Sequence, residues 1–216
     1  MLLFDALSPA PRTLRMYLLE KGLTLPVRQV DVMTGENRRL PYLARNPAGQ
    51  TPTLALDDGT TISESIAIMN YLEELHPEPP LIGSTPEERA VTRQWQRRAE
   101  LNVTENIHNA FHYAEGLKRF TGRIPLAPEA AAGLKRVAQD RIAWLDGMIG
   151  DHRFLAGERF TIADIWLYVW LDFGESVKQP FDHALPHLGP WFARIAARPS
   201  AAASLHAGCK PGGVRG

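Results

Sequence analysis

A serine followed by two prolines stands where the first helix of the chain is predicted to begin. Ser8, Pro9 and Pro11 lie between a short apolar run and a helical pattern. A serine hydroxyl can donate a hydrogen bond to an anion such as a thiolate, and a helix N-terminus adds a positive potential. The same hydroxyl also suits an N-cap, in which role it would serve the helix itself. Ser8 is therefore a candidate catalytic donor, with helix capping as the alternative.

Two histidines and two further helix starts also carry candidate chemistry. His108 and His112 are four residues apart, so they share one face of a predicted helix. They can be interpreted as a metal pair or as residues that line a cleft, but no third metal ligand is evident. Ser63 is interpreted as the cap of the helix that follows it. Thr161 and Asp164 fit a capping box with Asp in place of Glu, which gives Asp164 a structural role.

The elements that position these residues in the first part of the chain follow from the spacing of apolar side chains. They are a strand, a helix, a strand, a hairpin and a helix, at residues 2–4, 11–21, 27–32, 53–62 and 63–75. A strand–helix–strand unit forms a parallel pair with a right-handed crossover, and a hairpin adds antiparallel strands. The pattern predicts a small mixed sheet with helices on its faces.

A proline-rich linker separates this part from a part without convincing strands. Residues 76–80 hold three prolines, which favour an extended connection. Beyond them, helices are predicted at about 86–120, 129–149, 161–175 and 188–197. The predicted organisation is a domain at 1–77, a linker at 78–86, a helical domain at 87–200 and a flexible tail at 201–216.

Composition excludes several classes of protein. The chain has 216 residues with 24 basic and 24 acidic side chains, and this zero net charge argues against a general nucleic-acid binder. A hydrophobic fraction of 44% argues against a disordered chain. The single cysteine, Cys209, allows no internal disulfide and is interpreted as an exposed thiol without function. We expect no signal peptide and no membrane span, hence a cytoplasmic globular protein.

Four segments, taken together, resemble cytosolic glutathione S-transferases: residues 7–12, 46–54, 63–68 and 154–164. The resemblance extends over essentially residues 1–200. It implies an α/β plus all-α fold, with a thioredoxin-like N-terminal domain followed by an all-helical C-terminal domain. It also implies a homodimer. Neither end of the Ser8–Pro11 segment is cysteine, so dithiol–disulfide exchange is excluded.

The resemblance further implies residues that bind glutathione. A cis bond between Thr51 and Pro52 would turn the backbone of Thr51 outward, to pair with the cysteinyl main chain as a strand edge does. Gln50 would touch the peptide from the other side. Ser65, at a helix N-terminus, would hold the γ-glutamyl carboxylate through its N–H and hydroxyl. Glu64 would meet the ammonium group or orient the loop.

Two parts of the site keep alternatives open. Asn37 and Arg38 are candidates for the glycyl carboxylate, although Arg38 can equally be a solvated side chain. Ser8 and Arg12 match the four-residue spacing of serine-type members of the family. In some bacterial and fungal subgroups, a water held by the first long helix of the second domain activates the thiol. In that case His112 is the candidate residue.

The function implied is therefore transfer of glutathione, as its thiolate, to a hydrophobic electrophile. Glutathione acts as a co-substrate, and neither a bound cofactor nor a metal is expected. The expected partners include no nucleic acid and no membrane. The alternatives are a specialised glutathione-dependent lyase, dehalogenase or etherase, and a non-catalytic glutathione-binding module of the same fold.

Overall fold

The structure is a computed structural model that describes residues 1–216, and the chain divides into two compact units. The first unit holds Met1–Leu81, Pro199–Pro211 and Arg215–Gly216. The second unit holds Ile82–Arg198 and Gly212–Val214. The C-terminal residues thus return to the unit in which the chain begins.

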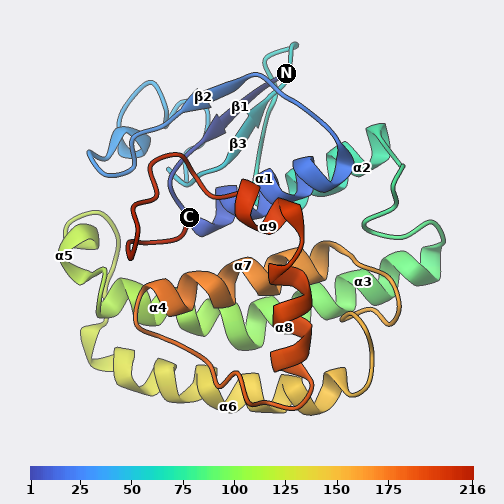
Figure 1. The fold of residues 1–216 in the computed structure, drawn as a ribbon. Helices are drawn as coiled ribbons and strands as arrows, with labels where there is room; N and C mark the ends of the chain where they lie inside the picture. The colour runs from blue at the N-terminus through green and yellow to red at the C-terminus, as the bar shows by residue number, and fades with distance from the viewer. The chain divides into compact units, whose positions relative to one another are not determined.

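The first unit is built on a four-stranded sheet with the order β2-β1-β3-β4. The strands are β1 (Leu2–Asp5), β2 (Val27–Gln29), β3 (Thr53–Ala55) and β4 (Thr61–Ser63). β1 pairs parallel to β2 and antiparallel to β3, and β4 pairs antiparallel to β3 (Figure 1). The predicted mixed sheet and its hairpin are confirmed. The predicted strand at 27–32 is shorter, because pairing with β1 ends at Gln29.

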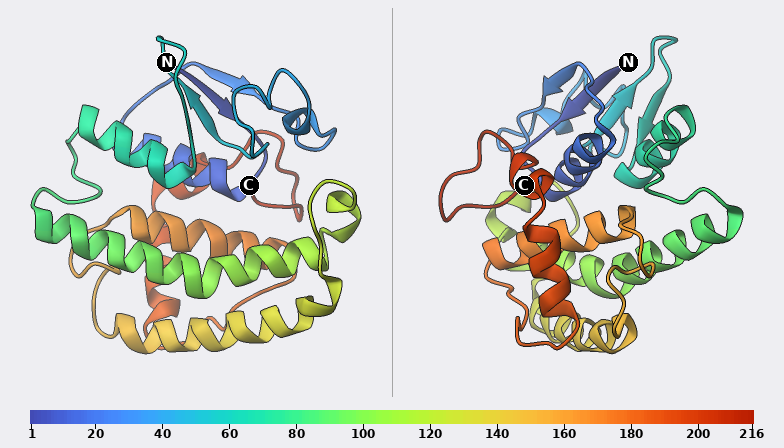
Figure 2. Two further views of the ribbon diagram at one scale, coloured as in Figure 1. Left: turned by 180° about the vertical axis from the view of Figure 1, so that it is seen from behind. Right: turned by 45° about the vertical axis from the view of Figure 1, so that its right-hand side comes forward.

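Helices α1 (Pro9–Lys21) and α2 (Ser65–Leu75) lie side by side on one face of the sheet (Figures 1 and 2). Leu14 and Met16 of α1 and Ile68 of α2 are fully buried. The helix predicted to begin at Ser63 begins two residues later, because Ser63 still pairs with Thr53 in the hairpin. The two helix starts, where the candidate site residues lie, therefore stand beside each other.

The other face of the sheet is covered by the segment between β2 and β3. Alternate residues of a strand point to opposite faces, so Phe4 faces away from its buried neighbour Leu3. Phe4 packs with Val30 and Tyr42 in a small buried cluster. A short 3-10 helix, Glu36–Arg38, lies within the covering segment. This segment carries Asn37 and Arg38.

The second unit is all-helical, as predicted. Its helices are α3 (Pro86–Ala99), α4 (Glu105–Tyr113), α5 (Leu117–Phe120), α6 (Ala131–Ile149), α7 (Ile162–Ser176) and α8 (Leu188–Ala196), with a 3-10 turn at Pro128–Ala130. α7 forms the centre, because every residue from Ile162 to Gly174 is buried. None of the helices is both long and apolar enough to cross a membrane.

The helix predicted at 86–120 is interrupted. A π-helical turn, Glu100–Thr104, separates α3 from α4, and α4 ends at Tyr113. Near the interruption, the side chains of Asn102 and Thr104 bond to carbonyls four residues back, at 3.0 and 3.3 Å. Such side-chain bonds compete with the regular backbone ladder and distort helices.

The C-terminal residues form one short helix and then contact the first unit. Residues 199–203 form α9 (Pro199–Ala203), and the residues after it bond to the first unit. Arg12 donates to the carbonyl of Ala201 at 3.2 Å, and Arg15 donates to the carbonyl of Ser204 at 2.8 Å. These charged donors come from α1, so they hold the end of the chain against the start of that helix.

Candidate functional site

The start of α1 leaves the hydroxyl of Ser8 uncommitted. Ser8 occupies the N-cap position with an extended backbone, φ −161° and ψ 153°, and its side chain makes no capping hydrogen bond. Its carbonyl accepts the N–H of Arg12 at 3.2 Å. Pro9 follows at the first helical position, where a missing N–H costs nothing. The capping alternative for the Ser8 side chain is therefore not what the structure adopts.

Arg12, four residues after Ser8, contacts the end of the chain. Its side chain is buried, and it bonds to the carbonyl of Ala201 and to the hydroxyl of Ser204 at 3.2 and 3.4 Å. A buried guanidinium needs several acceptors, and α9 supplies them. Arg12 thus joins the helix behind Ser8 to the end of the chain.

The turn before β3 is fixed by two buried side chains. The peptide bond between Thr51 and Pro52 is cis, as the resemblance implied. The carbonyl of Gln50 accepts the hydroxyl of Tyr42 at 2.6 Å and the amide of Asn46 at 2.9 Å. The side chain of Gln50 is exposed and Pro52 is buried. This turn therefore presents Gln50 and Thr51 from a rigid base.

The start of α2 carries both residues expected to meet the γ-glutamyl group. Glu64 is the N-cap, exposed, with a positive φ of 68°. Such a backbone costs about 1 kcal/mol or more in a non-glycine residue and often marks a functional site. Ser65 is buried, and its hydroxyl donates to the carbonyl of Ala10 at 2.8 Å. This bond ties the start of α2 to the start of α1, two residues after Ser8.

Asn37 and Arg38 lie against the loop that leads to β3. Asn37 is buried, and its amide donates to the carbonyl of Gly49 at 2.6 Å, while its side-chain oxygen has no partner. Arg38 donates to the carbonyl of Ala48 at 3.0 Å and is half-buried. Gly49 has a φ of +62°, and a Cβ there would lie only 3.0 Å from the Asn37 carbonyl. Arg38 keeps further guanidinium donors for a carboxylate, whereas the Asn37 amide already serves the fold.

The first unit therefore brings together most of the residues that the sequence singled out. Its loops and helix starts carry Ser8, Asn37, Arg38, Gln50, Thr51, Pro52, Glu64 and Ser65. Between them they offer the hydroxyl of Ser8, guanidinium donors of Arg38, backbone groups at two helix starts and the exposed carboxylate of Glu64. This set suits a zwitterionic peptide that carries two carboxylates, an ammonium and a thiol.

His112 belongs to the second unit, on α4. Its ring lies 4.1 Å from that of His108 and 4.1 Å from that of Phe120, between ring centroids. The ring of His108 lies 4.8 Å from that of Trp170. Burial, together with the smaller effect of the neighbouring His112, lowers the pKa of His108 to about 3. No cluster of three or more metal-ligating side chains occurs in the structure.

Asp164 sits at the start of α7 as the acceptor for four donors. Its carboxylate accepts the N–H and hydroxyl of Thr161 at 2.8 and 3.0 Å, the N–H of Leu155 at 2.9 Å and the indole N–H of Trp191 at 2.8 Å. The capping box is therefore formed. Burial raises the pKa of Asp164, and the four donors oppose this rise.

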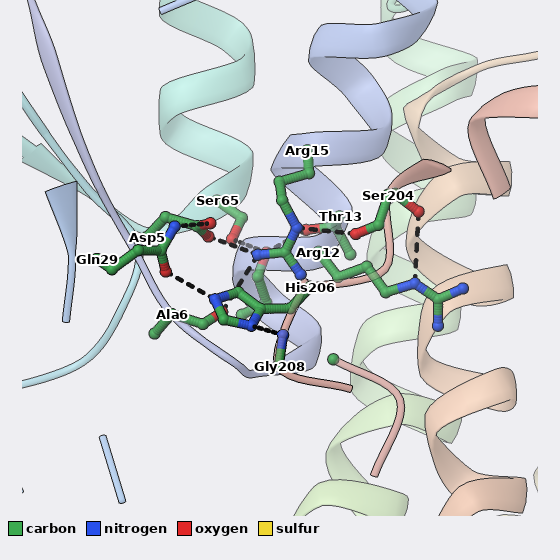
Figure 3. A network of polar contacts seen from close by, with 12 residues as sticks. Asp5, Ala6, Arg12, Thr13, Arg15, Gln29, Ser65, Ser204, His206 and Gly208 are labelled. Atoms are coloured by element: carbon green, nitrogen blue, oxygen red, sulfur yellow. Dashed lines mark hydrogen bonds and ion pairs between the residues drawn. The ribbon is translucent and has the colours of Figure 1, made fainter. Parts of the chain in front are cut away.

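Sequence reasoning missed a polar network that surrounds the start of α1 (Figure 3). Arg15 pairs with the buried carboxylate of Asp5 at 2.5 Å. Gln29 donates to Asp5 at 3.1 Å, and His206 bonds to Gln29 at 2.7 Å. Asp5 follows three apolar residues in a strand, and a carboxylate at that place is the one signal that a buried partner exists.

Models of one protein family match both units. The model of the glutathione S-transferase N-terminal domain matches residues 7–75, and that of the C-terminal domain matches residues 107–199. These matches cover the start of α1, the turn before β3 and the start of α2.

Individual relatives agree with the family models. The chain is 32% identical over 206 residues to Glutathione S-transferase 2 of Saccharomyces cerevisiae, covering 93% of this chain and 87% of that protein. It is 32% identical over 171 residues to the maleylacetoacetate isomerase of Pseudomonas aeruginosa, covering 74% of each. A solved glutathione S-transferase domain-containing protein of Marinobacter aquaeolei superposes with a TM-score of 0.87 at 40% identity, covering 93% of this chain and 100% of that one.

Proposed function

The chain belongs to the glutathione S-transferase family, and we propose that it activates the thiol of glutathione at Ser8 and transfers it to a hydrophobic electrophile. The observation that carries this proposal is the Ser8 hydroxyl, which stands at a helix start and makes no capping bond. Glutathione is the substrate that the family implies. The general activity, glutathione transfer, follows from the family. The role of Ser8 and the electrophile are the proposal.

The physical task is to stabilise a thiolate. A free cysteine thiol has a pKa of about 8.5, so only a few per cent is ionised at neutral pH. A hydroxyl donor and the positive end of a helix both favour the anion. Lowering the thiol pKa by about two units corresponds to about 2.7 kcal/mol. One charge-assisted hydrogen bond together with the helix end supplies stabilisation of this order.

The remaining residues of the first unit supply the binding energy. The backbone of Thr51 pairs with the cysteinyl main chain, and Gln50 contacts the peptide beside it. The N–H of Ser65 and the N-terminal end of α2 hold the γ-glutamyl carboxylate, while Glu64 meets the ammonium. Because the Ser65 hydroxyl donates to Ala10, its backbone N–H is the group assigned to the ligand. Arg38 meets the glycyl carboxylate, with Asn37 holding the loop beneath it.

A water held by α4 is the alternative source of activation. His112 is the residue assigned to that role, and its ring packs against those of His108 and Phe120. The two alternatives differ in one variant. Ser8→Ala abolishes a thiolate that depends on the serine, whereas it leaves a thiolate that depends on His112.

The test is a pH titration of protein-bound glutathione, followed by the ultraviolet absorbance of the thiolate. Wild type and Ser8→Thr, which keeps the hydroxyl, are expected to hold the thiol pKa well below its free value. Ser8→Ala is expected to return it toward the free value. A low thiol pKa that survives in Ser8→Ala and is lost in His112→Ala assigns activation to α4. Absence of glutathione binding in wild type overturns the proposal.

The isomerase relative favours a second candidate function at the same site. The maleylacetoacetate isomerase of P. aeruginosa covers 74% of the chain at 32% identity. An isomerase releases glutathione unchanged, so its product has the mass of its substrate. A transferase product gains the mass of glutathione. Mass spectrometry of the product with an aryl halide and with a cis-alkene diacid separates the two functions. A specialised lyase, dehalogenase or etherase would ignore the generic halide, and a binding module would turn over neither probe.

We also propose a cytoplasmic homodimer. Large apolar side chains stand exposed on both units, with Leu40 at 77% and Leu101 at 56% exposure. The resemblance to the family, whose members are usually homodimers, is what supports this proposal. Light scattering on the purified chain is expected to give twice the mass of one chain, and a mass of one chain overturns the assembly proposed.

A further inference from the structure

The residues after α9 return to the first unit and cover the start of α1. We call residues 204–211 together with 215–216 the C-terminal strap. We propose that the C-terminal strap occupies the position at Ser8 that the glutathione thiol needs, so the strap must leave before glutathione binds. This inference rests on the function proposed above. It makes the end of the chain a built-in competitor of the substrate.

The contact that blocks the site is between Gly216 and the backbone of Ser8. A Cβ placed on Gly216 would lie 2.7 Å from the Ser8 nitrogen and 2.9 Å from its Cα. Gly216 is buried, so the surface of Ser8 on that side is closed to other atoms. In this proposal the sulfur atom of glutathione takes the place beside the backbone N–H of Ser8, which is where Gly216 lies. The two occupants then exclude each other.

The strap has a base that is firmly held. Arg15 donates to the carbonyl of Ser204 at 2.8 Å, and Arg12 donates to the hydroxyl of Ser204 at 3.4 Å. Ser204 is fully buried. Hydrogen bonds from charged donors are about twice as strong as neutral ones. The base therefore stays in place when the tip moves.

The tip of the strap bonds mainly to itself. The N–H of His206 donates to the carbonyl of Gly216 at 2.9 Å, and the N–H of Cys209 donates to the carbonyl of His206 at 2.8 Å. The thiol of Cys209 donates to the same Gly216 carbonyl at 3.3 Å. These bonds hold Gly216 to the turn, so His206, Cys209 and Gly216 can leave Ser8 as one piece.

One side-chain latch joins the tip to the sheet. The ring of His206 accepts the N–H of Gly208 at Nδ1, 2.9 Å away, so its proton is on Nε2 and points to Gln29 at 2.7 Å. Gln29 in turn donates to Asp5, which pairs with Arg15 (Figure 3). Arg15 also donates to Ser204 at the base of the strap, so this network connects the base to the tip. The latch consists of neutral hydrogen bonds, which are weak enough to open.

A cavity of about 290 Å³ lies beside the latch, with Leu7, Val30 and His206 among the residues that line it. None of the residues assigned above to glutathione lines this cavity. Since His206 forms part of its wall, opening the strap enlarges the cavity.

The inference predicts tighter binding when the strap is displaced. A strap closed nine times out of ten raises the apparent dissociation constant about ten-fold. The probe is S-methylglutathione, which binds without thiol chemistry, measured by calorimetry. Two variants open the strap: a chain that ends at Leu205, and Gly216→Leu, whose side chain cannot fit against Ser8. The matched control is Ala207→Leu, which adds the same bulk at an exposed position of the strap.

The single cysteine reports the strap directly. Cys209 is partly covered, so alkylation by iodoacetamide measures how often the tip is open. We expect Gly216→Leu to raise the alkylation rate several-fold without any ligand. We expect S-methylglutathione to raise it in wild type, because binding and opening are linked reciprocally.

The outcomes separate this inference from the function on which it rests. About ten-fold tighter binding in both opened variants, with Ala207→Leu like wild type, supports the strap as competitor. Unchanged or weaker binding in both opened variants overturns it, whatever Cys209 does. If no form binds S-methylglutathione, the proposed function fails. The strap is then judged by Cys209 alone, and an alkylation rate in Gly216→Leu equal to wild type overturns it too.

Discussion

The starts of α1 and α7 use the same cap residue type in opposite ways. Each begins at an extended hydroxyl residue, with φ −161° at Ser8 and −137° at Thr161. At α7 the hydroxyl of Thr161 donates to Asp164, and every group around that carboxylate is buried and paired. At α1 the hydroxyl of Ser8 makes no capping bond. A helix start that pairs all its polar groups supports the fold, whereas one that leaves them unpaired can serve a ligand.

The two helix starts also contribute differently to the stability of the fold. A cap contributes about 1 kcal/mol, and the four donors to Asp164 bring the start of α7 well above that value. The start of α1 is secured differently, through the buried Arg12 and the hydroxyl of Ser65. This arrangement holds α1 in position without a capping bond from the Ser8 side chain. Stability and function are therefore carried by neighbouring but separate residues.

The largest effect is expected at Asp164. Asp164→Ala leaves four buried donors without an acceptor, and we expect a loss of about 3–5 kcal/mol in the free energy of unfolding, measured in urea. The matched control is Asp58→Ala, which removes an exposed carboxylate that accepts one backbone N–H. We expect that change to have a much smaller effect, because solvent replaces the lost acceptor. Equal losses at the two positions would contradict the comparison drawn above.

Ser8→Ala is expected to give the reverse pattern. The value of kcat/KM with a generic aryl halide should fall about 10- to 100-fold, equivalent to about 1.4–2.7 kcal/mol of transition-state stabilisation. The free energy of unfolding should change by less than about 0.5 kcal/mol, because no capping bond is lost. Ser8→Thr should recover most of the activity. A stability loss of 1 kcal/mol or more in Ser8→Ala would place Ser8 with Asp164 as a structural cap.

Local patterns made much of this fold predictable. The hairpin, the capping box and the helix beginning after Thr85 depend on residues a few positions apart, so their spacing indicates them. Thr85 accepts the N–H of Glu88 at 3.2 Å, as a cap should. The candidate site residues lie in loops and helix starts for the same reason. Their motifs are short and continuous in sequence.

Contacts between distant residues were not predictable in this way. Arg15 and Ser204 are 189 positions apart, and His206 and Gln29 are 177 apart. No periodicity links such residues, so the strap was expected to be flexible. Arg12 is the instructive residue, because its spacing from Ser8 fits the serine-type pattern but does not indicate that its guanidinium bonds to the carbonyl of Ala201 in α9. A motif identifies a residue type and its spacing, whereas the role of the side chain depends on the groups that it contacts in the fold.

His108, on α4 of the second unit, is only partly exposed, and its ring packs against those of His112 and Trp170. Burial lowers its pKa to about 3, below the usual value of about 6.5. Below about pH 6.5 His108 is protonated in the unfolded chain but stays neutral in the folded chain. The free energy of unfolding therefore decreases as the pH falls below about 6.5. We expect a loss of about 1–2 kcal/mol at pH 5 relative to pH 8, measured in urea. His108→Phe should lose less over this range, while the exposed His152→Phe should behave as wild type.

His206 lies in the C-terminal strap, near Ser8. Its protonation is expected to have the smallest of the effects predicted here, a change in ligand affinity. Its latch needs a neutral ring, because Nδ1 accepts the N–H of Gly208. Burial lowers the pKa of His206, the cation of Arg15 lowers it further, and Asp5 opposes them. Asp31 and Glu36, the other charged groups lining its cavity, also favour the protonated ring.

A pH series on two chains isolates this latch. Burial and Arg15 disfavour the protonated ring of His206 while the strap is closed, so the C-terminal strap opens as the pH falls below about 6.5. The measurement is the ratio of S-methylglutathione dissociation constants between wild type and the chain that ends at Leu205. Taking the ratio cancels the ionisation of the ligand itself. We expect it to fall a few-fold toward one between pH 7.5 and pH 5. A ratio that stays constant or rises on acidification would show that the latch does not depend on the charge of His206.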